Sequence, residues 1–208
     1  MRIASPIAAR RAARGHGIAT LELAIVLPLL ALLLFMLVDL SRAIQAKTIL
    51  LNISREGANL SARATADLTG SSQSIMNALA ATTPPLDMPA RGMIYITKIM
   101  GSPTGANGSL RNIVLEQYRW NAGAQRSGYQ PASQVWQCGN WNAGGACGAI
   151  GKSGAAPGVD LMQGQLAEGE LIYAVETFYR FDPLFGAIDT GAPRAPLLGS
   201  DLYAMTVF

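Results

Sequence analysis

The longest apolar run of the chain lies near its N-terminus, over residues 18–38, and Glu22 is the only ionisable residue in it. A helix rises 1.5 Å per residue, so this run would reach about 31 Å, which matches the hydrocarbon core of a bilayer. A cleavable secretory signal has a shorter apolar region of about 7–15 residues, followed by small residues. Here Asp39 and Arg42 follow instead. The pattern therefore predicts a retained transmembrane helix.

Beyond Asp39 the helical period continues, but with polar residues on much of the surface. Apolar residues recur at steps of three, four and seven, as on one face of an amphipathic helix. They are Leu37, Leu40, Ile44, Leu51, Ala58 and Ala62. No proline occurs between Leu29 and Thr83. One helix can therefore run from Ile18 to about Ala66, on the order of 70 Å if straight.

The segment after this helix contains helix-breaking and turn-forming residues. Gly70-Ser71-Ser72 is predicted to interrupt the helical pattern, and a short second helix is expected from Ser74 to Ala81. Thr83-Pro84-Pro85 would close that second helix.

From Gly92 the hydrophobic period changes to two, which predicts strands. The expected strands are residues 93–100, 110–120, 170–179 and 202–208. The first two are separated by a glycine-rich loop and are expected to pair. The order predicts an α+β fold, in which a long N-terminal helix, transmembrane in its first half and amphipathic in its second, packs on a small antiparallel sheet.

The distribution of charge fixes an orientation for the predicted span. Arg2, Arg10, Arg11 and Arg14 precede it, and no acidic residue lies among the first 17. The positive-inside rule then places the N-terminus in the cytoplasm and the C-terminal part outside. The formal net charge is +3, but without those four arginines 12 basic and 13 acidic residues remain. The basicity therefore sets topology, and no nucleic-acid partner is expected.

Four regions follow from these patterns. Residues 1–17 form a basic cytoplasmic leader, residues 18–38 the transmembrane helix, residues 39–68 its extracytoplasmic continuation, and residues 69–208 an extracytoplasmic α+β domain.

The two cysteines, Cys138 and Cys147, lie in the part placed outside the cytoplasm. The intervening residues are rich in glycine, so the two cysteines can approach each other, and an oxidising compartment favours a disulfide between them. A disulfide that closes a loop of this size would stabilise the folded protein by about 2–3 kcal/mol. Two free, buried thiols are the alternative. Neither a metal nor a cofactor is expected, since the only histidine, His16, lies in the leader.

Glu22 needs an explanation, because an acidic residue inside a span is costly and usually marks a partner. It lies about one turn into the helix, so its carboxylate can snorkel to the headgroups. The other interpretation is that it meets a positive charge within the membrane. If the chain were cut after Gly17, the new α-amino group of Ile18 would supply that charge. Pro28 removes one helical hydrogen bond and is expected to bend the span.

Four sequence features together resemble the TadE-like pseudopilins of the tight-adherence (Flp, type IVc) pilus system. They are Arg11-Ala-Ala-Arg-Gly-His-Gly17, the Gly17-to-Glu22 spacing, Leu27-Pro28-Leu29-Leu30 and Arg55-Glu56-Gly57-Ala58. The resemblance covers residues 10–64 well. In major Flp pilins a tyrosine follows the glutamate, whereas this chain has Leu23.

The resemblance implies a minor pseudopilin in the bacterial inner membrane. A prepilin peptidase would cut between Gly17 and Ile18, and Glu22 would pair with a neighbouring N-terminus during assembly. Other pilins, other pseudopilins and the inner-membrane assembly platform would be its partners.

The two alternatives to a pseudopilin are a binding module and an enzyme. A permanently anchored binding module would keep its leader and capture a ligand with residues 121–160. The aromatic residues of that region, Tyr129, Trp136 and Trp141, are instead expected to pack as a small core around the disulfide. An enzyme is not expected, because the sequence has no nucleophile elbow, phosphate-binding glycine loop or clustered carboxylates.

Overall fold

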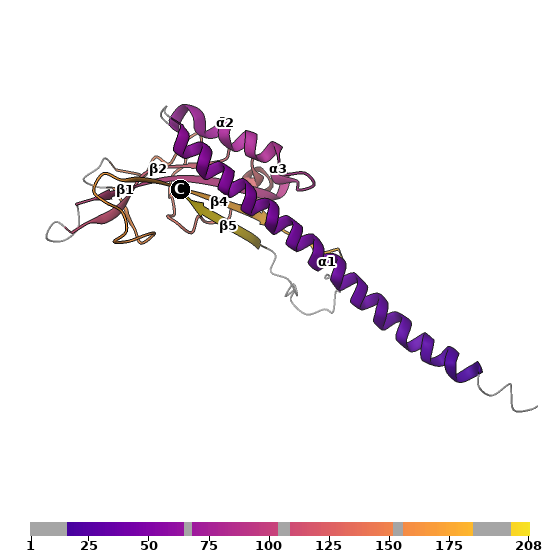
Figure 1. The fold of residues 1–208 in the computed structure, drawn as a ribbon. Helices are drawn as coiled ribbons and strands as arrows, with labels where there is room; N and C mark the ends of the chain where they lie inside the picture. The colour runs from indigo at the N-terminus through magenta and orange to yellow at the C-terminus, as the bar shows by residue number, and fades with distance from the viewer. Residues whose placement is uncertain (1–15, 65–67, 104–108, 152–155, 185–200) are drawn as a thin grey trace, which may run out of the picture.

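A computed structural model describes residues 16–64, 68–103, 109–151, 156–184 and 201–208, with the backbone alone for residues 16–19. One long helix, α1 (His16–Arg63), carries an α+β domain on its second half. Its first half projects away from the rest of the molecule, as Figure 1 shows. The predicted long helix and α+β fold are confirmed, with α1 beginning two residues before Ile18 and ending at Arg63.

Among the described residues, α1 is followed by the helices α2 (Leu68–Ala81) and α3 (Met88–Arg91) and by the 3-10 helix η2 (Ala124–Ser127). The predicted break at Gly70-Ser71-Ser72 is wrong, since these residues lie inside α2. They fall near its start, where backbone N–H groups lack helical partners and poor helix formers cost little. The buried face of α2, formed by Leu68, Ser72, Met76 and Leu79, has helical spacing, so packing outweighs local propensity.

Five antiparallel strands form one sheet in the order β3-β2-β1-β4-β5. The strands are β1 (Gly92–Ser102), β2 (Arg111–Arg119), β3 (Gly158–Val159), β4 (Leu171–Arg180) and β5 (Asp201–Val207). The four predicted strands are confirmed, and β1 pairs with β2 as expected. The sequence did not predict β3, because two residues are too few to show a period.

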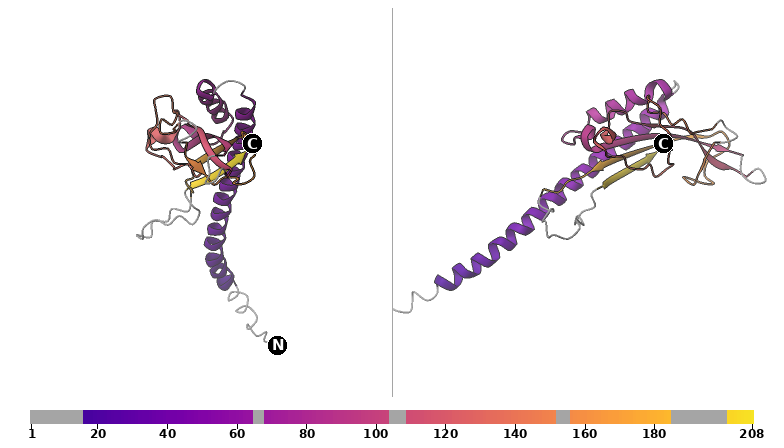
Figure 2. Two further views of the ribbon diagram at one scale, coloured as in Figure 1. Left: turned by 90° about the vertical axis from the view of Figure 1, so that its left-hand side faces the viewer. Right: turned by 180° about the vertical axis from the view of Figure 1, so that it is seen from behind.

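Helix α1 packs across β4 and β5, and α2 lies beside it on the same side of the sheet (Figure 1, Figure 2). The Thr177 hydroxyl of β4 donates to the Leu50 carbonyl of α1 at 3.2 Å. The hydroxyls of Ser54 and Thr206 are 2.9 Å apart, and Lys47 Nζ donates to the Tyr203 carbonyl. These contacts fix the second half of α1 against the C-terminal strands.

A buried carboxylate holds the loop around Ser133 and Gln134 on the face of the sheet opposite α1. Glu176 is next to Thr177 in β4 and therefore points away from α1. Its side chain is fully buried. The Gln134 amide donates to Oε1 at 2.7 Å, the Tyr203 hydroxyl donates to the same oxygen at 3.1 Å, and the Ser133 hydroxyl donates to Oε2. This carboxylate thus links two strands to the loop.

Burial raises the pKa of Glu176 above its ordinary 4.5, while its hydrogen bonds with Ser133, Gln134 and Tyr203 act in the opposite direction. A folded carboxyl with the higher pKa binds more protons than the unfolded chain does. Its contribution to stability is therefore complete below about pH 4.5 and is lost as the pH rises toward the folded pKa.

The difference in unfolding free energy between wild type and Glu176→Gln should fall as the pH rises through this window. Urea denaturation at a series of pH values measures it. Glu56→Gln makes the same substitution at an exposed position and serves as the control. If the difference in unfolding free energy between wild type and Glu176→Gln did not change with pH, the carboxyl would have the same pKa in the folded and the unfolded protein.

The predicted disulfide joins Cys138 and Cys147, with their Cα atoms 5.9 Å apart. The predicted small core around it is wrong. Tyr129 and Trp141 pack with the main core, and Trp136 packs with a second cluster at the other end of the sheet. The ring of Trp141 lies 5.8 Å from that of Tyr95 in β1. Large aromatic rings pack on the sheet because its apolar surface is larger than that of the disulfide.

Candidate assembly site

The first half of α1 is bare. From Thr20 to Val38 nearly every residue is exposed, including the apolar ones: Leu21 is 63% exposed and Leu29 is 60% exposed. Among the described residues, α1 is the one helix long and apolar enough to cross a membrane. Exposed apolar surface of this extent is stable in lipid or against other helices, not in water. The helix therefore supports single-pass membrane anchoring.

The predicted scissile bond lies at the start of this helix. Gly17 and Ile18 belong to the first turn of α1, directly after His16. Glu22 follows Ile18 by four residues and therefore lies one turn further along the same helix face. Processing between Gly17 and Ile18 stays a prediction, and so does the pairing of Glu22 with a new N-terminus.

The Glu22 side chain is exposed and makes no ion pair or hydrogen bond with another described residue. The domain begins to cover α1 only at Asp39. That residue is about 26 Å further along the helix axis, so no side chain of the described domain can reach Glu22. Among the described residues, Glu22 therefore has no cationic partner.

Pro28 also lies on the bare part of α1, and the helix continues through it. Proline leaves the carbonyl of the residue four positions earlier, Ala24, without its amide partner. A bend at this position stays a prediction.

The motif Arg55-Glu56-Gly57-Ala58 divides between two faces of α1. Arg55 and Glu56 are exposed, whereas Gly57 and Ala58 are buried. A Cβ added at Gly57 would lie 2.7 Å from Leu79 Cδ1 of α2 and 3.0 Å from Val175 Cγ1 of β4. Gly57 therefore lies where α1 packs tightly against α2 and the sheet.

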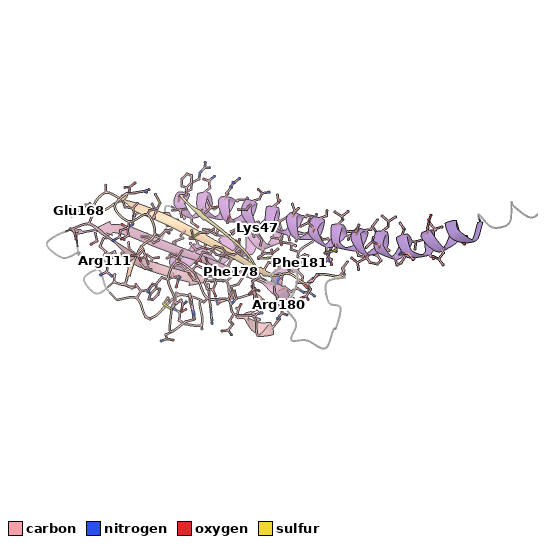
Figure 3. All side chains as sticks on the ribbon, turned by 90° about the horizontal axis from the view of Figure 1, so that it is seen from below. Lys47, Arg111, Glu168, Phe178, Arg180 and Phe181 are labelled. Atoms are coloured by element: carbon pink, nitrogen blue, oxygen red, sulfur yellow. A yellow bond between two sulfur atoms is a disulfide. The ribbon has the colours of Figure 1, made fainter. Side chains whose placement is uncertain are left out.

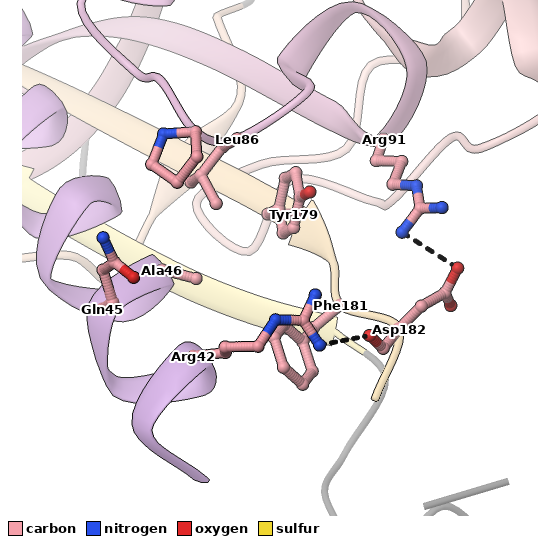
Figure 4. A pocket seen from close by; sticks show the side chains of 9 residues that line it. Arg42, Gln45, Ala46, Leu86, Arg91, Tyr179, Phe181 and Asp182 are labelled. Carbon is pink, nitrogen blue, oxygen red and sulfur yellow. Dashed lines mark hydrogen bonds and ion pairs between the residues drawn. The ribbon is translucent and has the colours of Figure 1, made fainter. Parts of the chain in front are cut away.

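A polar cluster that the sequence did not indicate surrounds α1 where it enters the domain. Asp39 is 3% exposed, and its Oδ1 accepts from Arg42 Nη1 at 3.3 Å and from the Leu184 amide at 2.8 Å. Arg91 of α3 pairs with Asp182 at 3.0 Å. Figure 4 shows both arginines lining one pocket with Asp182. The feature of the sequence that could have indicated this cluster is Asp39, an acidic residue directly after the apolar run.

The described residues include no group of three or more histidine, cysteine, aspartate or glutamate side chains that could hold a metal ion. The features that stand out are thus a bare apolar helix, one carboxylate on it, and a polar cluster at its exit from the domain.

An α+β domain carried on a long helix whose first half is apolar and exposed suggests a protein that a single helix anchors in a membrane. Residues 17–59 match the family model described as TadE-like protein. This part of the chain is therefore similar to the TadE-like family, a similarity that suggests an association with the Tad pilus. No curated protein and no solved structure matches the chain.

Proposed function

We propose that the protein is a minor pseudopilin needed for assembly of a Tad/Flp type IV pilus. A prepilin peptidase removes residues 1–17, and the mature chain spans the inner membrane through residues 18–38. The N-terminus faces the cytoplasm, and the domain lies in the periplasm. The observation that carries this proposal is Glu22, a carboxylate on a bare apolar helix beyond the reach of the described domain.

Processing would create the partner that Glu22 lacks. Cleavage after Gly17 gives Ile18 a charged α-amino group one helical turn from the level of Glu22. When two such helices lie side by side, the amino group of one can meet the carboxylate of the other inside the membrane. Because an unpaired charge is costly there, this pairing favours one axial position of the two helices.

The TadE-like match supports this assignment, since residues 17–59 contain Gly17, Glu22 and the Arg55–Ala58 motif. The domain after residue 68 is too large for the small major pilin of such systems, which favours a minor component. In the anchored-binding-module alternative, the 121–160 region would present its aromatic residues to a ligand. Tyr129 is instead buried, and Trp136 and Trp141 are half-buried against the sheet.

The proposal is tested by blocking the peptidase. Gly17→Val is expected to keep its leader, because a branched side chain next to the scissile bond would not fit the peptidase. Gly15→Val, two residues earlier in the leader, is the matched control and should be cut normally. Intact mass of both proteins, recovered from cells that express the peptidase, measures the result. A Gly17→Val protein with the mature mass would contradict cleavage at this bond.

A further inference from the structure

We propose that the end of the domain nearest the span rests on the lipid surface and binds a phospholipid phosphate through Arg42 and Arg91. This inference rests on the membrane span of the proposed function and adds a second membrane contact, made by the domain itself.

No spacer separates the bare helix from the domain. Val38 is 39% exposed, and the next residue, Asp39, is only 3% exposed. The Asp39 carboxylate accepts from the Leu184 amide, which ties the chain after β4 to the last turn of the apolar run. Arg42 follows Asp39 by about 4.5 Å along the helix axis. When α1 spans a bilayer, both residues lie at the level of the headgroups.

The orientation of the sheet places one end of the domain at this level. Figure 3 shows Arg180 and Phe181 at the end from which the bare helix leaves, and Glu168 and Arg111 at the opposite end. Strand β4 runs from Leu171 to Arg180, so its C-terminal end points toward the membrane and its start points away.

The two arginines have the chemistry of a phosphate site. Their side chains are 39% and 38% exposed, and both line the pocket in Figure 4. Phe181 packs under the Arg42 guanidinium at 5.4 Å, and Arg91 is held by Asp182. Among the described residues, each arginine makes its polar contacts through Nη1 alone. Its other N–H donors are available for a phosphate, whose geometry matches the guanidinium fork.

The nearby carboxylates decide which lipid chemistry fits. Asp39 and Asp182 balance the two arginines, so the site has no excess charge to attract anionic membranes from a distance. Recognition therefore depends on the phosphate group, which zwitterionic and anionic phospholipids share. We expect binding to phosphatidylcholine and to phosphatidylglycerol alike.

Apolar residues around the cluster complete the lipid contact. Leu184 is 62% exposed although its backbone is bonded to Asp39. On the outer side of α1, Leu40 is 44% exposed and Ile44 is 59% exposed. These three side chains extend the apolar surface of the span around the arginines, which suits the boundary between acyl chains and headgroups.

Spin labels on the full-length protein in phosphatidylcholine vesicles test the placement. A label at Leu184→Cys should collide several-fold more with oxygen, relative to a water-soluble nickel complex, than a label at Leu171→Cys. Leu171 is the matched control because it is an exposed leucine at the other end of β4. Equal accessibility of the two labels would overturn the proposal.

A label at Leu32→Cys, in the middle of the span, shows whether the helix itself lies in the membrane. It therefore distinguishes a wrong placement of the domain from a wrong proposed function. A lipid-exposed Leu32 with a water-exposed Leu184 would show a domain held off the membrane. A water-exposed Leu32 would instead remove the span, and the proposed function with it.

The arginines are tested by counting phospholipids that remain bound to the protein in native mass spectrometry. Arg91→Gln should retain several-fold fewer phospholipids than wild type and shift the Leu184 label toward water. Arg111→Gln, an exposed arginine at the far end of the domain, should change neither. An Arg91→Gln protein that keeps its lipids and its label depth would overturn the phosphate site.

Discussion

Glu22→Ala is expected to be processed and inserted normally and to stop pilus assembly. Its side chain is exposed on the bare helix, so the substitution removes no contact within the described part of the protein. It removes the carboxylate that a neighbouring α-amino group would meet, and thus leaves that amino group unpaired in the membrane. Pilus counts in the electron microscope and the intact mass of the membrane-bound protein together measure this outcome.

Two further variants test whether assembly requires the negative charge at position 22 in particular. Glu22→Gln keeps the size and polarity of the side chain and should fail in assembly as well, because the amide carries no charge. Glu168→Ala removes an exposed carboxylate from the far end of the domain and should assemble normally. Normal pili in the Glu22→Ala strain would leave Glu22 as a residue that only reaches the headgroups.

Gly57→Val is expected to destabilise the domain by about 1–3 kcal/mol, the usual cost of forcing extra methyl groups into a packed core. The first added carbon would already lie 2.7 Å from Leu79 and 3.0 Å from Val175. Leu79 is 1% exposed and Val175 is fully buried, so a shift of either side chain disturbs other packing in the core. Helix α1 would have to lift away from α2 and β4. Urea denaturation followed by circular dichroism of the protein in detergent measures the loss.

Gly70→Val is the matched control for backbone effects. Gly70 is also a helical glycine, but an added Cβ there meets nothing within 4 Å. Because valine is a slightly better helix former than glycine, this variant should be unchanged or slightly more stable. Equal destabilisation of the two variants would show that the Gly57 contact is not the cause.

Much of the fold could be predicted from period and composition. The apolar run and the amphipathic pattern after Asp39 gave a helix that ends three residues before the expected Ala66. Alternation with β-branched residues located four of the strands, since each is long enough to show its period. Exposure of Arg55 and Glu56 and burial of Gly57 follow from their positions around α1.

Long-range contacts could not be predicted in this way. In the sequence, Glu176 is a single polar residue within a predicted strand. Its burial depends on hydrogen bonds from Ser133 and Gln134, which lie more than 40 positions earlier. The cluster at the exit of α1 joins Asp39 to a residue 145 positions later. The start of α2 at Leu68 depends on the packing of its buried face, which outweighs the Gly-Ser-Ser signal.

Whether the protein is processed as a prepilin is decided by the N-terminal sequence and intact mass of the protein recovered from its own membranes. We expect an N-terminus at Ile18 and the loss of residues 1–17. A retained leader would contradict it and favour a permanently anchored protein with a binding role for the domain.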